Sequence, residues 1–262
     1  MTASSTGTES WLLGISMRVA PSNRKSLKLS VVGGVILLFI PVFVSLVDGR
    51  KRKVACEHLK SEGIEVAFDF ADSGWLRDTL GDLFGDACVH DVQRVTLDSQ
   101  SVTDDIGNAL QALSPIKRLV FDGATIGPCL MSSIRSLEVE AVYFIDCKFD
   151  GRVIFGVPDS TQFLMVENCD LSGISVQGIS SAKSLEELWL DRAGVNGGRL
   201  VGMRFPSLEI LSILGVPPLD AKLLKSCFPS LETLFVSEEL WTEAYGKQIE
   251  NALRIQVVRS QH

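Results

Sequence analysis

The sequence predicts an α/β fold in which about seven short strands form one parallel sheet, with short helical or 3-10 segments returning the chain between strands. Apolar residues recur in units of 22–24 residues, at offsets 0, 3, 5 and 10 counted from the first residue of each unit. This spacing combines strand alternation with a return segment. A fixed repeat of this length is typical of a solenoid. A 19-residue run without charge near the N-terminus predicts a transmembrane helix ahead of the repeats.

The first 47 residues differ in composition from the rest of the chain. Residues 1–28 are rich in Ser and Thr and then in Arg and Lys, and we expect a disordered basic tail. Leu29–Val47 is long enough to cross a bilayer core of ~30 Å at ~1.5 Å per residue. We therefore expect a single-pass membrane protein. The alternatives are a buried core helix and a cleaved signal peptide, but no A-x-A-like cleavage site follows the run.

Basic residues flank both ends of this run and bear on its orientation. Four precede it within residues 18–28, and four follow it as the denser cluster Arg50–Lys53. The positive-inside rule therefore favours a cytoplasmic C-terminal domain. The same cluster could also lie on anionic lipid head groups.

Residues 48–90 are predicted to be a basic juxtamembrane segment followed by a capping unit. We expect a helix over 54–63, a strand over 64–70 and a helix over 73–84. A repeat array has to cover its first open face with an atypical unit, which is the expected role of this segment. The isolated His58 and His90 favour surface or capping roles over catalysis.

The repeat itself occupies the predicted domain 91–262, and its start-to-start steps are 24, 23, 22, 24, 23 and 23 residues. Seven copies align on offsets 0, 3, 5 and 10. They are Val92-Val95-Leu97-Val102, Ile116-Leu119-Phe121-Ile126, Val139-Val142-Phe144-Phe149, Thr161-Leu164-Val166-Leu171, Leu185-Leu188-Leu190-Val195, Leu208-Leu211-Ile213-Pro218 and Leu231-Leu234-Val236-Trp241.

This pattern resembles the leucine-rich repeat, L-x-x-L-x-L-x-x-N/C-x-L, over about residues 92–250. The ninth position matches in type only at Cys147 and Cys169, so we expect a looser turn ladder in the other repeats. We expect these two cysteines to stack on adjacent repeats as small buried side chains. A disulfide between them is the alternative. The whole chain resembles bacterial membrane-anchored leucine-rich-repeat proteins. That resemblance implies an interaction scaffold and carries no catalytic residues.

The segments between the strands vary in composition. Helices are predicted over 103–113, 219–228 and 242–253, and a final strand over 254–258. The Gly- and Ser-rich segments 151–160 and 173–184 are predicted to be irregular or 3-10. Residues 194–198 are predicted to form a turn.

Charge and motifs exclude several classes of function. The net charge is −7, with +6 in residues 1–53 and −13 in the remainder, which argues against nucleic-acid binding. No catalytic motif or dinucleotide fingerprint is present, so we expect no enzyme activity, no catalytic residues and no cofactor. We also expect no metal, because acidic residues on separate repeats do not form a dedicated calcium loop.

Outward-facing residues on the concave side of the sheet are the candidate site. Offsets 3 and 5 face the core, so offsets 2, 4 and 6 face outward. The pattern predicts a protein-binding face in which large apolar residues lie beside acidic residues that favour a basic partner. These residues are Tyr143, Met165, Trp189 and Phe235 with Asp98, Asp122, Glu167 and Asp191.

Two alternatives remain open at this point. Bulky side chains are also what a parallel sheet prefers on structural grounds alone. The chain could instead be a structural subunit of a membrane complex that assembles through the transmembrane helix or the convex face. The partner, the pathway and the oligomeric state are not fixed by the sequence.

Overall fold

A computed structural model of the chain describes residues 47–70, 79–82, 85–98 and 104–260. The predicted basic tail 1–28 lies outside these residues, as does the predicted transmembrane helix 29–47 except for Val47. Residues 45–262 form one compact unit, and the description below concerns its described residues.

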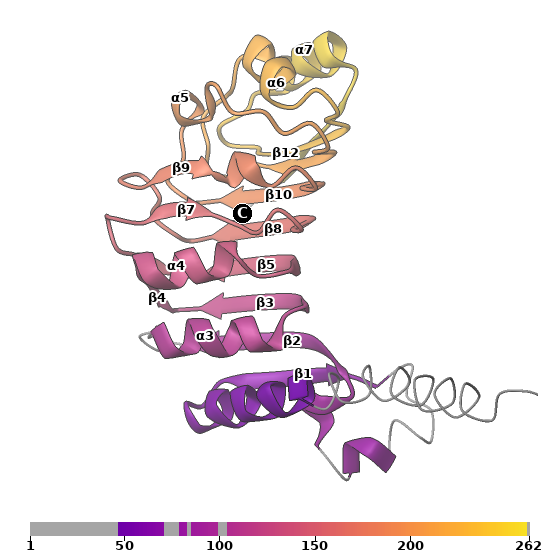
Figure 1. Ribbon diagram of the computed structural model, residues 1–262. Helices are drawn as coiled ribbons and strands as arrows, with labels where there is room; N and C mark the ends of the chain where they lie inside the picture. The colour runs from indigo at the N-terminus through magenta and orange to yellow at the C-terminus, as the bar shows by residue number, and fades with distance from the viewer. Residues whose placement is uncertain (1–46, 71–78, 83–84, 99–103, 261–262) are drawn as a thin grey trace, which may run out of the picture. The chain divides into compact units, whose positions relative to one another are not determined.

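The unit is an α/β structure built on one mostly parallel nine-stranded sheet, whose strands lie one above another in Figure 1. The strands lie in the order in which they occur along the chain. They are β1 (Glu65–Asp69), β2 (Asp91–Asp98), β3 (Ile116–Asp122), β5 (Val139–Ile145), β8 (Phe163–Glu167), β10 (Glu187–Asp191), β11 (Ile210–Ser212), β12 (Thr233–Ser237) and β13 (Gln256–Ser260).

The register of the sheet confirms the sequence alignment of the repeats. The residue predicted at offset 4 pairs with its counterpart on the next strand at every step, from Thr96 opposite Val120 to Ser212 opposite Phe235. Offsets 3 and 5 are buried in all seven copies, as predicted. Because one residue of slip would turn these apolar side chains to solvent, the burial pattern fixes the register.

The predicted fold class is nevertheless wrong as a whole. We predicted a leucine-rich-repeat solenoid of about seven units with a fully parallel sheet behind a transmembrane helix. The sheet has nine strands, and β1 runs antiparallel to β2. In the described part of the chain, no helix is both long and apolar enough to cross a membrane. The repeat alignment counts seven strands because β1 and β13 lack the full apolar spacing of the repeat. The separately predicted strands 64–70 and 254–258 are confirmed as β1 and, two residues later, as β13.

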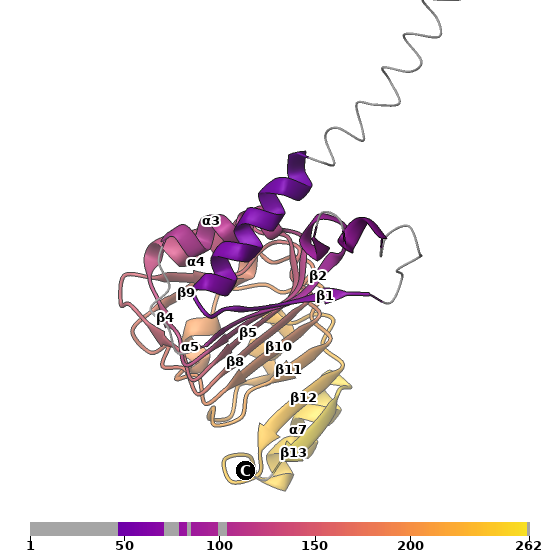
Figure 2. The ribbon, with the colours of Figure 1, turned by 90° about the horizontal axis from the view of Figure 1, so that it is seen from below.

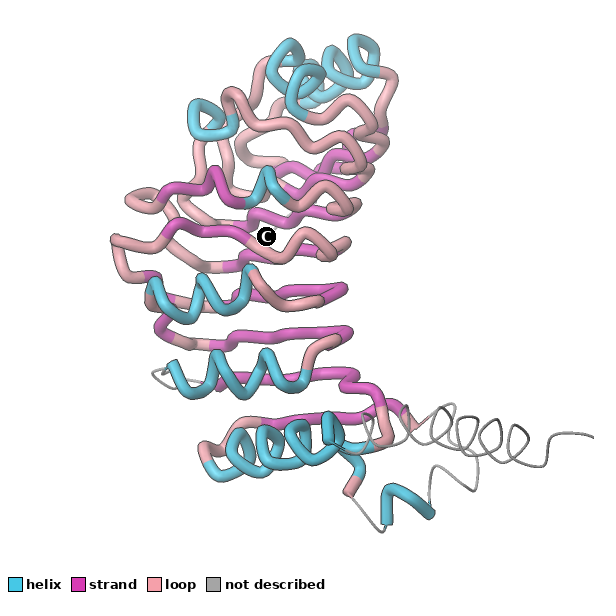
Figure 3. Tube along the Cα trace, viewed as in Figure 1, coloured by secondary structure: helices cyan, strands magenta, loops and turns pink. Residues whose placement is uncertain are grey.

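Helices and short strands return the chain between the main strands (Figure 3). The predicted helices are confirmed as α3 (Asp104–Leu113), α6 (Ala221–Cys227) and α7 (Glu243–Leu253). The sequence did not predict α4 (Pro128–Arg135), and α5 (Gly197–Leu200) begins inside the predicted turn. Figure 2 shows α3 and α4 together on one side of the sheet.

The segments predicted to be irregular are partly strand. β7 (Ile154–Gly156) pairs with β9 (Ser175–Gly178), and a 3-10 turn, Ile179–Ser181, follows. A second small sheet joins β4 (Thr125–Ile126) to β6 (Lys148–Phe149). These pairs form because the return segments of successive repeats lie as close together as their strands do.

The capping unit also departs from its prediction. The described helix covers 47–61, which begins before the predicted helix, and β1 lies within the predicted strand. Of the predicted helix 73–84, residues 79–82 are helical, and a 3-10 turn covers Asp86–Cys88. His90 is buried in this unit, with its ring 4.6 Å from that of Phe70, which agrees with a capping role.

Each repeat turns sharply where its strand ends, and the turns are joined by a backbone ladder. The residue at offset 7 has a left-handed φ of 51° to 81° in five successive repeats, at Gly123, Asp146, Asn168, Arg192 and Gly215. In the first four, its N–H donates to the carbonyl at offset 6 of the next repeat at 2.8–3.0 Å. Of the repeats without cysteine, those of Gly123 and Arg192 keep this bond, so the expected loosening is absent there. The Gly215 N–H donates to the Ser237 hydroxyl oxygen instead. Gly, Asn and Asp adopt this conformation at low cost.

The contact between β7 and β9 gives the first testable prediction. A Cβ atom added at Gly178 would lie 2.5 Å from the Phe155 carbonyl oxygen, whereas one added at Gly173 would meet nothing within 4 Å. We expect Gly178→Ala to lower the free energy of unfolding by about 1–3 kcal/mol. Gly173→Ala is the matched control and should change it by less than about 0.5 kcal/mol. Chemical denaturation measures both, and equal effects would contradict the close approach of the two strands.

Candidate functional site

The candidate site is the face of the sheet that carries offsets 2, 4 and 6, which we call the open face. Offsets 3 and 5 point to the opposite, helix-bearing side and form the core. On the open face, six of the seven offset-4 residues are half-buried: Thr96, Val120, Tyr143, Met165, Trp189 and Phe235. The seventh, Ser212, is fully buried.

Trp189 and Phe235 form a stacked aromatic pair across an intervening strand. They lie on β10 and β12, with β11 between them. Strands two apart are separated by roughly 10 Å, yet the ring centroids are 5.3 Å apart at an interplanar angle of 26°. The rings can meet because β11 presents the small Ser212 at this register, and they bury it. The result is a rigid apolar surface that is preformed without a ligand.

The same face offers further apolar surface and an unused donor. The rings of Tyr143 and Phe163 lie 4.9 Å apart, and Met165 is between Tyr143 and Trp189 in the register. The Trp189 indole Nε1 is buried and has no hydrogen-bond partner in the described part of the chain. A Trp N–H without an acceptor is unusual inside a protein.

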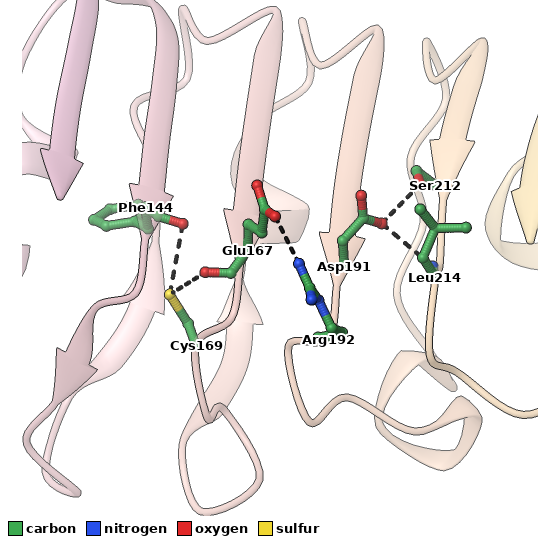
Figure 4. A network of polar contacts seen from close by, with 7 residues as sticks. All are labelled: Phe144, Glu167, Cys169, Asp191, Arg192, Ser212 and Leu214. Atoms are coloured by element: carbon green, nitrogen blue, oxygen red, sulfur yellow. Dashed lines mark hydrogen bonds and ion pairs between the residues drawn. The ribbon is translucent and has the colours of Figure 1, made fainter. Parts of the chain in front are cut away.

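Asp191 has a structural role between β10 and β11, where it contacts Ser212 and Leu214 (Figure 4). Its side chain is on the predicted outward position, but the residue is only 7% exposed. Its Oδ1 accepts a hydrogen bond from the Ser212 hydroxyl at 2.7 Å and another from the Leu214 backbone N–H at 3.2 Å. In the last repeat, the Ser237 hydroxyl oxygen similarly accepts from the Gly215 N–H at 2.6 Å.

The other predicted acidic residues lie in two environments. Asp98 and Asp122 are exposed and adjacent on β2 and β3, opposite each other in the register. Glu167 is half-buried, and its carboxylate accepts from the Arg192 guanidinium at 2.8 Å (Figure 4). The four carboxylates therefore do not act as one acidic column, and they do not converge with the aromatic pair.

A second set of acidic residues was missed by the sequence analysis. Glu186, Glu209 and Glu232 are exposed at offset 1 of the last three repeats. The Glu209 N–H donates to the Glu186 carbonyl, and the Glu232 N–H donates to the Glu209 carbonyl, each at 2.8 Å. Glu187 follows at offset 2, on the open face two residues before Trp189. The same alignment would have revealed this row if offset 1 had been compared across repeats.

Cys147 and Cys169 stack on adjacent repeats as predicted. Both are buried free thiols, and the Cys147 N–H donates to the Cys169 sulfur at 3.2 Å. The Cys169 thiol donates to the Glu167 and Phe144 carbonyls (Figure 4). Its contact with the Cys147 sulfur, together with burial, raises the pKa of Cys169 far above that of a free thiol. The pair fills the turn ladder and presents no nucleophile.

A groove of about 650 Å³ lies on the helical side, between helix 47–61 and α3. Val54, which is 60% exposed, and Ala109 and Ala112 give it apolar walls, while Arg50 and Asp105 lie at its margin. It shares no residue with the open face.

Neither the geometry nor known sequences identify a chemical reaction. Among the described residues, no three His, Cys, Asp or Glu side chains are grouped so that they could hold a metal ion. No protein-family model matches this chain, and no curated protein matches it in sequence. The arrangement offers apolar contact area and carboxylates, which are groups for binding.

The buried carboxylate gives the second prediction. Asp191→Ala leaves the Ser212 hydroxyl and the Leu214 N–H without their acceptor, and we expect it to lower the free energy of unfolding by about 1–3 kcal/mol. Asp122→Ala removes an exposed carboxylate from the same offset and should change it by less than about 0.5 kcal/mol. Thermal and urea denaturation test the pair. A larger loss in the Asp122 variant would contradict the assigned role.

Proposed function

We propose that this protein binds another protein through the open face of its sheet, with the Trp189–Phe235 pair at the centre of the contact. The proposal rests on the geometry of the open face. It is carried by one observation: two large aromatic rings are stacked, partly exposed and held on a rigid sheet.

Physical considerations favour binding over a purely structural role for this pair. Aromatic side chains fixed on regular structure lose little conformational entropy when a partner covers them, and such residues dominate binding energy at protein interfaces. Tyr143, Phe163 and Met165 extend the apolar surface from β10 across β8 to β5.

A crosslinking experiment with the full chain tests the proposal. A photocrosslinking amino acid at position 165, beside Trp189 in the register, should capture a protein partner that mass spectrometry identifies. Trp189→Ala should then weaken binding of the purified partner by about 2 kcal/mol or more, roughly thirtyfold. Calorimetry or fluorescence anisotropy measures the affinity.

Val201→Ala provides the control for this measurement. Val201 is 65% exposed and caps the C-terminus of α5, in a return segment outside the sheet. Its truncation should leave the affinity unchanged, and circular dichroism should show that both variants remain folded. If Trp189→Ala binds the partner as well as the wild-type chain does, the open face is not the interface.

The groove on the helical side supports a second candidate function, assembly as a structural subunit. Val54 is strongly exposed for an apolar side chain and lies at the wall of a 650 Å³ groove. Isolated exposed apolar residues are common, so this candidate has weaker support than the first. Val54→Asp should disrupt complexes formed through the groove while leaving capture at position 165 intact.

A further inference from the structure

We propose that the partner presents a basic extended segment, with an Arg or Lys side chain stacked on the Trp189–Phe235 pair and paired with Glu187. Further cations of the same segment would pair with the exposed row formed by Glu186, Glu209 and Glu232, which lies next to the open face where β10, β11 and β12 begin. This inference rests on the proposed function, because it specifies the chemistry of the ligand of the same open face.

The acidic residues near the strand ends are not all available to a partner. Where β8 and β10 end, Glu167 is bound to Arg192, and Asp191 is bound to Ser212 and Leu214. Where the strands begin, Glu186, Glu187, Glu209 and Glu232 have no ion pair or side-chain hydrogen bond within the described part of the chain. A charged partner would therefore find its counter-ions at the beginning of β10, β11 and β12.

The spacing of the row matches an extended cationic segment. Glu186, Glu209 and Glu232 immediately precede the adjacent parallel strands β10, β11 and β12. Backbone hydrogen bonds of 2.8 Å join them, so their Cα atoms are roughly 4.8 Å apart. Like charges at this spacing repel each other. An extended segment that crosses the strands would place its alternate side chains on one face, about 6.6 Å apart. Flexible Arg or Lys side chains at this spacing could each reach one of the successive carboxylates.

The aromatic pair and Glu187 provide a site for one cation of that segment. Glu187 and Trp189 point to the same face two residues apart on β10, roughly 6.6 Å along the strand. A guanidinium over the indole ring would gain a cation–π contact and could reach the carboxylate as well. Trp is the best ring for such a contact, and a planar guanidinium stacks on it more readily than an ammonium does.

Binding of synthetic peptides to the full chain tests the inference directly. The probe is a fluorescent eleven-residue peptide of alternating Arg and Ala, compared with the same peptide in which citrulline, its uncharged isostere, replaces Arg. We expect the Arg peptide to bind and the citrulline peptide to bind at least about tenfold more weakly. The affinity of the Arg peptide should also fall as the salt concentration rises.

Charge-reversal variants locate the peptide on the structure. Glu187→Lys and Glu209→Lys should each weaken the Arg peptide by about tenfold or more. Glu62→Lys is the matched control, since Glu62 is exposed at the end of helix 47–61, and it should have little effect. Equal binding of the Arg and citrulline peptides, equal effects of all three reversals, or no binding at millimolar peptide would each overturn the inference.

The outcomes separate this inference from the proposed function. If Trp189→Ala abolishes binding of the partner crosslinked at position 165 while Glu187→Lys and Glu209→Lys leave it unchanged, the open face binds a protein that is not basic. Self-association of the chain that Glu209→Lys abolishes, without peptide binding, would assign the face to a second copy and also overturn the inference.

Discussion

The register between successive parallel strands is the constraint on which the rest of the structure depends. It is fixed on one side by fully buried residues such as Leu188 and Leu211, and at the strand ends by the left-handed turn ladder. Because each strand repeats the position of the one before it, every offset becomes a row of side chains across the sheet. The aromatic pair and the acidic row are both consequences of that stacking.

Small residues within these rows are as important as large ones. Ser212 allows Trp189 and Phe235 to meet across β11, and its hydroxyl donates to Asp191. A larger side chain at position 212 would separate the rings by occupying the space between them. The aromatic surface therefore depends on a buried hydrogen bond as well as on apolar contact, which links the stability of the fold to the shape of the site.

The sequence predicted the strands, their register and the apolar outward column, because these follow from a period of two within a period of about 23 residues. It also predicted strands close to β1 and β13, but it could not predict that β1 would join antiparallel, since pairing at an edge depends on tertiary contacts. Nor could it separate Asp191, which is buried and bonded, from Asp122, which is exposed at the same offset. That difference arises from the hydroxyl at position 212 on the neighbouring strand.

The central claim is that a protein partner covers the open face. Hydroxyl-radical footprinting of the full chain, with and without the partner identified by crosslinking, tests it without altering a residue. The account predicts that Met165, Trp189 and Phe235 become protected from oxidation when the partner binds, while Tyr245 on α7 remains as reactive as before. Protection of Tyr245 with unchanged reactivity of Trp189 and Phe235 would contradict the claim.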